Sequence, residues 1–462
     1  MMPFTLSLFS DGRSSRRVGV MGLGQTGWSA VRWLHAQGCE LVVVDTRENP
    51  PHHADLLRDY PDVPCFTGAV SADVFREVDW VLLSPGVSPH EAALVVAREH
   101  NIPLLGDIEV GARIMNLAVR RPVILAVTGA NGKSTVVTLL GRMAEEQGKA
   151  VAVAGNIGVP LLEVLSGKSW PDVLVLELSS FQLETLQSLE ADAAVVLNVT
   201  EDHMDRYPDM TRYAAAKARI YQGCRHPVVN REDPWNSLEQ AVSFGLDEPA
   251  EGHWGLRDEG KNGAWLAYGQ HNILRSDELP LLGRHNVANA LAALALGEAV
   301  GWQRDLMAQA LRHASGLPHR VETVAVVNGV TYVDDSKGTN VGATVAALKG
   351  MGAPVVLIAG GDGKNQDFTP LGEAVRAHAK AVVLIGRDGP RMAQVLDGFG
   401  VACHRSNTLP EAVAQAAALA ERGDIVLMSP ACASFDMFRH YGHRAEVFRQ
   451  AVTALDAGQE KR

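Results

Sequence analysis

Short runs of apolar, often β-branched residues recur along the chain, and each leads through a turn into an Ala/Leu-rich stretch with helical spacing. These runs cover residues 17–21, 123–127, 173–176, 355–358, 382–385 and 425–428. Strands that are apolar throughout and alternate with helices are typical of parallel sheets covered on both faces. The pattern therefore predicts an α/β fold, in which the residues just after each strand line the ligand crevice.

The pattern starts anew at three places, which predicts three domains. We expect a Rossmann-like N-terminal domain over residues 1–111, a central domain with a P-loop-type parallel sheet over 112–317, and a Rossmann-like C-terminal domain over 318–462. The polar stretch 243–277 interrupts the alternation and predicts a small peripheral insert that is antiparallel or irregular. The length of 462 residues agrees with this division, because domains average roughly 150 residues.

Composition and charge narrow the class of protein. Hydrophobic residues make up 47% of the chain, which is enough for several cores. The formal charge of −11 argues against a protein that binds nucleic acid or an anionic membrane surface. Five scattered cysteines without a Cys-x-x-Cys pair support neither a disulfide scaffold nor a zinc site. No apolar run approaches the ~18–20 residues of a membrane span, so we expect a cytoplasmic protein without membrane insertion.

The sequence TGANGKST at 128–135 follows an apolar strand and precedes a helix-like run at 136–145. In this setting backbone N–H groups bind phosphate, Lys133 adds a positive charge, and Ser134 or Thr135 can ligate Mg²⁺. The strict Walker spacing would need a glycine where this chain has Val127. A structural turn with a surface lysine is the alternative, but the strand–loop–helix setting favours binding of a nucleoside triphosphate.

Further candidate residues follow the next strands of the same domain. Glu177 closes the run at 173–176, where a carboxylate could hold Mg²⁺ or orient water beside the phosphate loop. The segment 198–207 follows another strand and carries carboxylates together with His203. This grouping is compatible with metal ligation or phosphoryl chemistry, although a lone histidine in a turn is more often a hydrogen-bonded structural residue.

Lys217 lies between Tyr213 and Tyr221 at helical spacing, so that all three share one helix face. A lysine flanked by tyrosines is usually a surface residue whose stem packs on the helix while its charge reaches water. The pattern by itself therefore predicts no catalytic role for Lys217.

The first domain carries a glycine fingerprint. Gly22-x-Gly24-x-x-Gly27 follows a strand and opens a helix, and Asp45 ends the next strand. This pattern is typical of a dinucleotide site, in which the acidic residue binds the ribose hydroxyls. Arg47 favours a ligand with additional negative charge. The fingerprint serves any nucleotide diphosphate, and a purely structural turn is the other interpretation.

Taken together, these motifs resemble the Mur ligase family, and in particular its glutamate-adding branch. The resemblance spans the whole chain, from the glycine motif at 22–27 to SPACASFD at 429–436. Ordered motifs between these two ends lie at 129–135, 177–184, 198–207, 282–286, 318–320, 335–340 and 360–364. As a set the motifs are highly specific, although no single one is.

The resemblance implies an ATP-dependent amide ligase of cytoplasmic peptidoglycan-precursor synthesis. Its substrates would be UDP-N-acetylmuramoyl-L-alanine, D-glutamate and ATP. ATP would convert the substrate carboxylate into an acyl phosphate, which the amine of glutamate then attacks. The implied cofactors are ATP and two Mg²⁺ ions, the implied oligomeric state is a monomer, and a hinge is expected near residues 316–319.

The resemblance also assigns roles to individual residues. The implied ATP-binding residues are Gly129, Asn131, Gly132, Lys133, Ser134, Thr135, Asn286, Asn289, Arg320 and Asp335. The implied UDP-substrate residues are Gln25, Thr26, Thr46, Arg47, Ser84, Gly86 and Asn156. The implied amino-acid residues are Lys337, Thr339, Lys364, Ser434, Phe435 and Tyr441. The implied catalytic residues are Lys133, Glu177, His203 and Lys217, and the implied metal ligands are Ser134, Glu177, His203 and a Lys217 that is carbamylated by CO₂.

Three other functions remain as alternatives. The first is another amino-acid ligase of the same superfamily. Such an enzyme would add L-glutamate, L-lysine or diaminopimelate, or it would be similar to folylpolyglutamate synthase. An NAD-linked dehydrogenase would explain the glycine fingerprint, but it leaves the phosphate loop, Glu177 and His203 unexplained. A non-catalytic nucleotide-binding regulator is the third, because intact motifs do not prove turnover.

Overall fold

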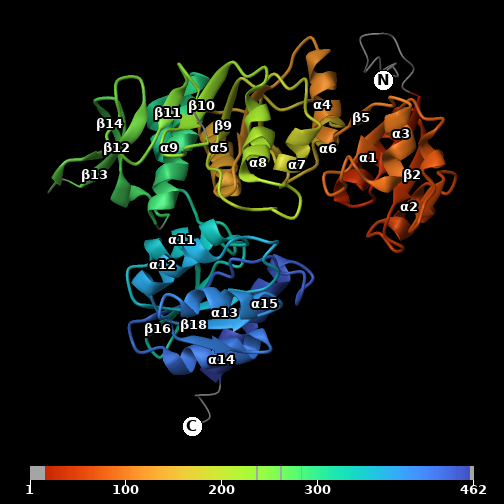
Figure 1. Ribbon diagram of the computed structural model, residues 1–462. Helices are drawn as coiled ribbons and strands as arrows, with labels where there is room; N and C mark the ends of the chain where they lie inside the picture. The colour runs from red at the N-terminus through yellow and green to blue at the C-terminus, as the bar shows by residue number, and fades with distance from the viewer. Residues whose placement is uncertain (1–15, 236–237, 261–262, 282, 458–462) are drawn as a thin grey trace.

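The computed structural model describes residues 16–235, 238–260, 263–281 and 283–457. The first 15 residues of the expected N-terminal domain and residues 261–262 of the expected insert lie outside the described residues. The described chain forms three sheets, each flanked by helices (Figure 1). This is the three-domain α/β architecture that the sequence predicts.

The first sheet is parallel and has the order β3-β2-β1-β4-β5. Its strands are β1 (Arg17–Met21), β2 (Glu40–Asp45), β3 (Cys65–Thr67), β4 (Trp80–Leu83) and β5 (Leu104–Leu105). Its helices are α1 (Gln25–Ala36), α2 (His53–Asp59) and α3 (Val95–Glu99), with the 3₁₀ turns η1 (Ala72–Phe75) and η2 (Ala92–Leu94). The strand order changes direction at β1, which opens a crevice at the carboxyl ends of β1 and β4.

The central sheet has the order β14-β13-β12-β11-β10-β9-β6-β8-β7. Its strands are β6 (Val123–Thr128), β7 (Val151–Gly155), β8 (Val173–Glu177), β9 (Ala193–Val196), β10 (His226–Asn230), β11 (Val242–Phe244), β12 (Trp254–Asp258), β13 (Ala264–Tyr268) and β14 (His271–Arg275). Its helices are α4 (Asp107–Asn116), α5 (Lys133–Glu146), α6 (Leu161–Leu165), α7 (Ser180–Glu184), α8 (Met210–Ala218), α9 (Arg284–Ala299) and α10 (Arg304–Arg312), with η3 (Arg219–Tyr221) and η5 (Ser276–Glu278).

The expected insert extends the central sheet. β11 pairs in parallel with β10, and β12, β13 and β14 then continue the sheet as an antiparallel ribbon. Trp254 is fully buried in the central core. The antiparallel prediction for this stretch is confirmed for its last three strands, but the ribbon is an edge of the main sheet and not a separate element.

The third sheet has the order β15-β16-β20-β17-β18-β19 and is parallel except for the antiparallel edge strand β15. Its strands are β15 (Glu322–Val327), β16 (Val330–Asp334), β17 (Val355–Gly360), β18 (Ala379–Ile385), β19 (Cys403–Arg405) and β20 (Ile425–Met428). Its helices are α11 (Val341–Gly350), α12 (Thr369–His378), α13 (Gly389–Asp397), α14 (Leu409–Leu419) and α15 (Tyr441–Ala457).

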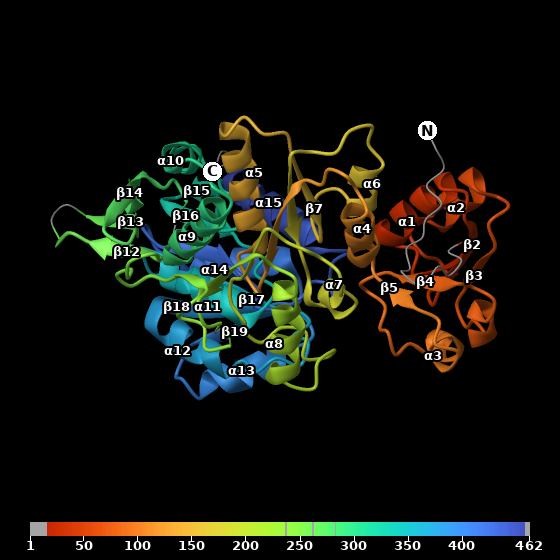
Figure 2. The same ribbon diagram turned by 90° about the horizontal axis from the view of Figure 1, so that it is seen from above.

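The first and central domains share part of their hydrophobic core. Buried apolar residues of the first sheet, such as Val18, share one core cluster with residues of the central sheet, such as Ala126. Residue 111, where we expect the first domain to end, lies inside α4, and α4 packs on α6 of the central domain. The central domain lies between the other two, with the ribbon β12–β14 at its far end from the first domain (Figures 1 and 2). Among the described helices, we find none with the length and apolar character needed to cross a membrane.

Candidate functional site

The predicted phosphate loop connects β6 to the first turn of α5. Gly132 precedes the helix with a φ of +86°, and Gly129 has a φ of +154°, both in the region that favours glycine. A Cβ on Gly132 would also lie 2.3 Å from Oδ1 of Asn289. Lys133 Nζ donates to the carbonyls of Gly129 at 2.7 Å and Ala130 at 3.0 Å. The ammonium group therefore folds back over the loop, where an anion would attract it.

A cavity of about 270 Å³ opens beside this loop, between the central and C-terminal domains. Seven of the residues that we assigned to ATP line it: Asn131, Gly132, Thr135, Asn286, Asn289, Arg320 and Asp335. Other lining residues were not predicted, among them Asn198, Thr200, Asn230, Phe244 and His285. Asn198 lies two residues after the end of β9, and Asn230 ends β10, which is the signal that could have identified them. The first residues of α11 close the cavity from the C-terminal domain.

Buried polar contacts connect this cavity to the C-terminal domain. Arg320 donates to Ser134 Oγ at 3.1 Å, which links the end of the interdomain segment to the first turn of α5. Asp335 accepts a hydrogen bond from Ser429 Oγ at 2.7 Å. Burial raises the pKa of Asp335 to about 7, although the nearby Arg320 opposes that shift. Whether Asp335 carries a proton therefore determines the charge on this wall of the cavity.

Glu177 ends β8 and is 1% exposed. Its Oε1 accepts a hydrogen bond from Asn156 Nδ2 at 2.8 Å, whereas Oε2 is buried without a hydrogen-bond partner among the described residues. The nearby carboxylate of Glu177 favours the charged form of Lys133. A buried carboxylate oxygen without a partner is costly unless a cation binds it. The site therefore fits a Mg²⁺ ion at Glu177.

His203 lies on the loop after β9, with its backbone in the left-handed region at a φ of +58°. Its ring packs edge-on against Phe181, with 4.7 Å between ring centroids. Burial lowers the pKa of His203 to about 4, against the opposing effect of Asp202. The imidazole is therefore neutral near pH 7, which is the form that binds metal ions. Metal ligation by His203 stays a prediction.

Lys217 is 2% exposed, so the surface lysine predicted from its pattern is wrong. Helix α8 packs on α7, and its inner face carries Tyr213, Ala216 and Lys217. Lys217 Nζ lies 4.5 Å from the centroid of the Tyr213 ring. Burial lowers the pKa of Lys217 well below its usual value, and the charge of Lys133 acts in the same direction. The structure thus holds an amine that is readily deprotonated.

The glycine fingerprint forms a tight turn at the carboxyl edge of the first sheet. A Cβ on Gly27 would lie 1.8 Å from the carbonyl oxygen of Gly22, so no larger residue fits there. Ser84 Oγ donates to the same carbonyl at 2.8 Å. The other residues that we assigned to the UDP substrate in this domain lie at the same edge: Gln25 and Thr26 in the first turn of α1, Thr46 and Arg47 after β2, and Gly86 after β4.

Asp45 is already engaged in this domain. Its carboxylate accepts bonds from Leu23 N at 2.7 Å and from Arg47 Nε and Nη2 at 2.8 and 2.6 Å. Burial opposes ionisation of Asp45, but these bonds from Arg47 and Leu23 lower its pKa overall. A dinucleotide site needs this carboxylate free for the ribose hydroxyls. The geometry therefore does not favour NAD.

A small pocket lies between the first and central domains. Ser84 lines it on one side, and Phe181, Gln182 and Arg206 line it on the other. Phe181 in turn contacts His203. The pocket therefore lies between Ser84, one of the predicted UDP-substrate residues, and the Phe181 ring that packs on His203.

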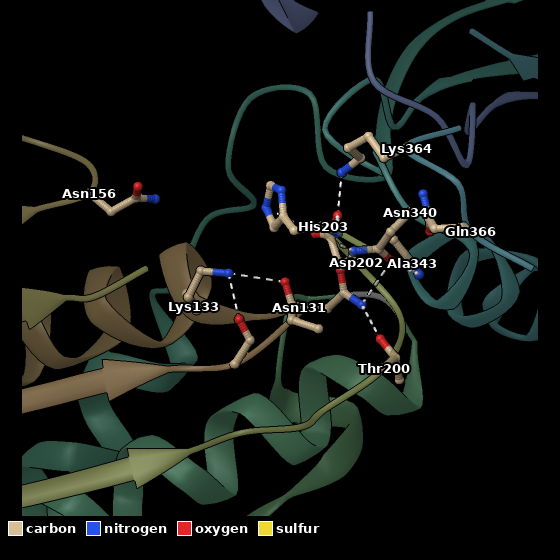
Figure 3. Close-up of polar contacts among 12 residues, drawn as sticks. Asn131, Lys133, Asn156, Thr200, Asp202, His203, Asn340, Ala343, Lys364 and Gln366 are labelled. Atoms are coloured by element: carbon tan, nitrogen blue, oxygen red, sulfur yellow. Dashed lines mark hydrogen bonds and ion pairs between the residues drawn. The ribbon is translucent and has the colours of Figure 1, made fainter. Parts of the chain in front are cut away.

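The residues that we assigned to the amino acid follow the carboxyl ends of β16, β17 and β20. Lys337 Nζ lies 4.0 Å over the ring of Tyr441, and Thr339 donates its N–H to the Lys337 carbonyl at 2.9 Å. Ser434 is buried, whereas Phe435 is 74% exposed. Lys364 points toward the central domain and forms an ion pair with Asp202 (Figure 3). The group thus surrounds an edge of the third sheet that faces the central domain.

Comparison with known proteins identifies the family of the chain. Residues 16–106 match the family "Mur ligase MurD-like, N-terminal domain", residues 127–297 the "Mur ligase middle domain", and residues 319–432 the "Mur ligase, glutamate ligase domain". The "UDP-N-acetylmuramoylalanine--D-glutamate ligase" of Thiobacillus denitrificans is 50% identical, covering 96% of this chain and 97% of that protein. The protein of the same name from Methylobacillus flagellatus is also 50% identical, over 95% of this chain and 97% of that protein.

Solved structures share the fold at low sequence identity. A UDP-N-acetylmuramate-alanine ligase MurC from Thermotoga maritima gives a TM-score of 0.62 at 20% identity, covering 95% of this chain and 99% of that one. MurF from Acinetobacter baumannii gives 0.60 at 17% identity over 94% of each chain. On the extent of the family matches and the identity to full-length relatives, the chain belongs to the Mur ligase family.

Proposed function

We propose that this chain is an ATP-dependent amide ligase that adds D-glutamate to UDP-N-acetylmuramoyl-L-alanine. One observation carries the proposal: the Lys133 ammonium lies near both Glu177, a buried carboxylate with an unpaired oxygen, and the neutral imidazole of His203. The names and the identity of the full-length relatives support the same substrates. Another amino-acid ligase of the superfamily would need a different amino-acid site, and a dehydrogenase would need Asp45 free.

The phosphate loop would bind ATP. The N–H groups at the start of α5 and the Lys133 ammonium would bind the phosphate oxygens, and Thr135 lies beside them. Asn286 and Asn289 would hold the base and ribose, and Arg320 and Asp335 would lie near the ribose and phosphates. The cavity that these side chains line supports this assignment.

Two Mg²⁺ ions would be held by side chains around the same cleft. We assign Ser134 and Glu177 to the first ion, and His203 and Lys217 to the second. Lys217 would bind as a carbamate, formed when its neutral amine attacks CO₂ and loses a proton, so that a cation becomes a carboxylate-like ligand. Bound Mg²⁺ neutralises the charge that builds up between phosphate and carboxylate. The unpaired oxygen of Glu177 and the burial of Lys217 support this arrangement.

The substrates would meet from opposite domains. The first domain would hold the UDP group through Gln25, Thr26, Thr46, Arg47, Ser84 and Gly86, and Asn156 would contact the muramoyl part. The alanyl carboxylate would attack the terminal phosphorus of ATP, forming an acyl phosphate and releasing ADP. The glutamate amine would then attack the acyl carbon, and collapse of the tetrahedral intermediate would expel phosphate.

The C-terminal domain would supply the amino acid. Lys337 and Lys364 carry the positive charge that two carboxylates require, and Thr339, Ser434, Phe435 and Tyr441 would complete the site.

We propose domain limits of 1–111, 112–317 and 318–462, and a monomer that acts in the cytoplasm. The hinge would lie near residues 316–319.

The test is phosphate release from ATP with UDP-N-acetylmuramoyl-L-alanine against a panel of D- and L-amino acids. We expect D-glutamate to give the highest turnover, and Lys133→Ala to abolish release because the phosphate oxygens lose their counter-charge. Release that does not depend on the UDP substrate would contradict the proposal. Enhanced nicotinamide fluorescence on adding NADH would instead support the dehydrogenase.

A further inference from the structure

Asp202 connects two domains through one carboxylate. It lies on the loop between β9 and α8 of the central domain and is 6% exposed. Its Oδ1 accepts the backbone N–H of His203 at 2.9 Å and an ion pair from Lys364, and its Oδ2 accepts a hydrogen bond from Asn340 Nδ2 at 3.2 Å. Lys364 and Asn340 belong to the C-terminal domain, whereas a third contact, from His203 Nε2 to Asp202 Oδ2 at 3.7 Å, stays within the central domain. Figure 3 shows the three side chains converging from opposite sides of the cleft.

The Lys364 end of this contact lies in the proposed amino-acid site. Lys364 and Asn365 have φ angles of +49° and +58°, a left-handed conformation that is strained for residues with a side chain. The Lys364 N–H donates to Asp362 Oδ1 at 3.0 Å, which helps to hold the loop in this shape. An ammonium group has three N–H donors. One of them points to Asp202, which leaves others for a substrate carboxylate.

The Asn340 end of the contact reaches the phosphate loop. Asn340 caps α11 by accepting the Ala343 N–H at 2.9 Å. It also exchanges two hydrogen bonds of 3.1 Å with the amide group of Asn131, which belongs to the phosphate loop. Asn131, Asn340, Asp202 and Lys364 thus form one continuous chain of side chains from the ATP site to the amino-acid site (Figure 3).

We propose that Asp202 is a positioning residue for the amino-acid step: from the central domain it holds the Lys364 ammonium and the start of α11 where glutamate binds. The inference rests on the proposed function. It means that the amino-acid site is complete only when the central and C-terminal domains are closed on each other. Asp202 itself does not line the proposed ATP cavity.

Asp202→Asn isolates this role, because the volume stays almost unchanged. A carboxylate accepts hydrogen bonds at both oxygens, whereas an amide accepts at one and donates at the other. The variant therefore keeps at most one of the two contacts and loses the negative charge beside Lys364. Charge-assisted hydrogen bonds are roughly twice as strong as neutral ones, so the ammonium loses its fixed position.

The experiment compares two amines as acceptors of the acyl group. Hydroxylamine attacks the acyl phosphate through its nitrogen, forms a hydroxamate and releases phosphate, and it has no carboxylate for Lys364 to bind. We expect Asp202→Asn to raise the KM for glutamate about tenfold or more, and to change hydroxamate formation less than about twofold. Glu201→Gln is the matched control, since Glu201 accepts the Asp367 N–H at 2.9 Å across the same cleft without touching Lys364. This control should leave both reactions unchanged.

Asn340→Ser provides a second variant that retains all charges. Serine caps helices well, but its hydroxyl cannot replace the amide bonds to Asp202 and Asn131. We expect a smaller rise in the KM for glutamate, again with hydroxamate formation preserved. Two results would overturn the positioning role alone. One is that both variants lose glutamate addition and hydroxamate formation to the same extent. The other is that hydroxamate formation by the variants requires more Mg²⁺ than it does in the unmodified protein. No hydroxamate from the unmodified protein would overturn the proposed function.

Discussion

At the scale of single residues, the most informative side chain of the central domain is Lys217. Its amine is buried against the ring of Tyr213, and burial lowers its pKa well below the usual range. A fully buried lysine is uncommon unless a partner or a chemical role stabilises it. Both the burial and the neighbouring charge of Lys133 favour the neutral amine. Neutral amines attack CO₂ and ammonium ions do not, so the structure favours the modification assigned to this residue.

We therefore expect Lys217→Ala to reduce turnover to a few per cent or less, because the proposed second metal site loses a ligand. Small carboxylates such as acetate should restore part of the activity, since the truncated side chain leaves space for one. The measurement is the rate of phosphate release with and without the added carboxylate. Lys168→Ala, at an exposed lysine, is the control. Full activity without rescue would show that a modified Lys217 is not needed.

A second residue links stability to pH. Asp107 begins α4 at the junction of the first and central domains, and its Oδ1 is buried without a hydrogen-bond partner among the described residues. Burial raises the pKa of Asp107 to about 6, against the opposing bonds from Ile108 and Gln182. The unfolded chain releases this proton near pH 4. Between these values the folded protein binds more protons, so its free energy of unfolding falls as the pH rises.

We expect Asp107→Asn to remove this decrease. The amide stays neutral at all pH values, so the variant should gain stability over the unmodified protein between about pH 4 and pH 6, by on the order of 2–3 kcal/mol. Denaturant unfolding at several pH values measures the difference. Asp62→Asn, at an exposed carboxyl, should leave the pH dependence as it is. If the free energy of unfolding had the same pH dependence in Asp107→Asn and in the unmodified protein, the role given to the burial of Asp107 would be contradicted.

At the scale of elements, the start of α11 determines how closely the central and C-terminal domains approach. A Cβ on Gly342 would lie 2.8 Å from Thr200 Oγ1 and 3.2 Å from Thr200 Cβ. Thr200 belongs to the loop after β9, and Asn131 Nδ2 lies within 3.5 Å of its hydroxyl. Only glycine therefore allows α11 to pack against this loop without displacing it.

Gly342→Ala should raise the KM for ATP and for glutamate severalfold while leaving α11 intact. Alanine is favoured over glycine in helices by about 1 kcal/mol, so a loss of activity would come from the clash across the cleft. Steady-state kinetics and thermal unfolding together separate the two effects. Gly352→Ala lies in the same domain, where a Cβ meets nothing within 4 Å, and should behave like the unmodified protein. Unchanged KM values in Gly342→Ala would contradict the close approach.

The sequence predicts the strands of this fold well for a physical reason. Residues 17–21 and 425–428 coincide with β1 and β20, because strands buried on both faces are apolar throughout and have clear ends. The stretch 243–277 shows its strands less clearly in the sequence. Its strands border solvent on one face, so their polar positions resemble those of loops.

The site could be predicted only in part. The phosphate loop has a local signature, since its glycines, lysine and hydroxyl must be adjacent to bind phosphate. The role proposed for Asp202 has none, because it depends on Lys364 and Asn340, which are more than 130 positions away in the sequence. Lys217 also shows the limit of pattern reasoning. Helical spacing shows which face a residue shares, but not whether another helix covers that face.

At the scale of the whole molecule, the segment between α10 and β15 connects the central domain to the C-terminal domain. His319 and Val321 have φ angles of +65° and +49°. A β-branched residue in this region is strained, and strain of this kind persists only where surrounding contacts maintain it. Polar contacts across the cleft supply such support, including Arg320 to Ser134 and Asn340 to Asp202.

These contacts imply that ligands control domain closure. A polar contact contributes only about 0.5–1.5 kcal/mol net, so a few of them favour the closed arrangement by a small margin. Residues of both domains line the cavity, so ATP bound there would contact both, and a ligand shifts such an equilibrium by its difference in affinity for the two states. We therefore expect X-ray scattering to give a smaller radius of gyration with an ATP analogue and the UDP substrate than without ligands. ADP-ribose, which lacks the γ-phosphate, is the control and should have little effect. Identical scattering curves with and without both ligands would contradict the predicted hinge, because closure would then not depend on what the cleft holds.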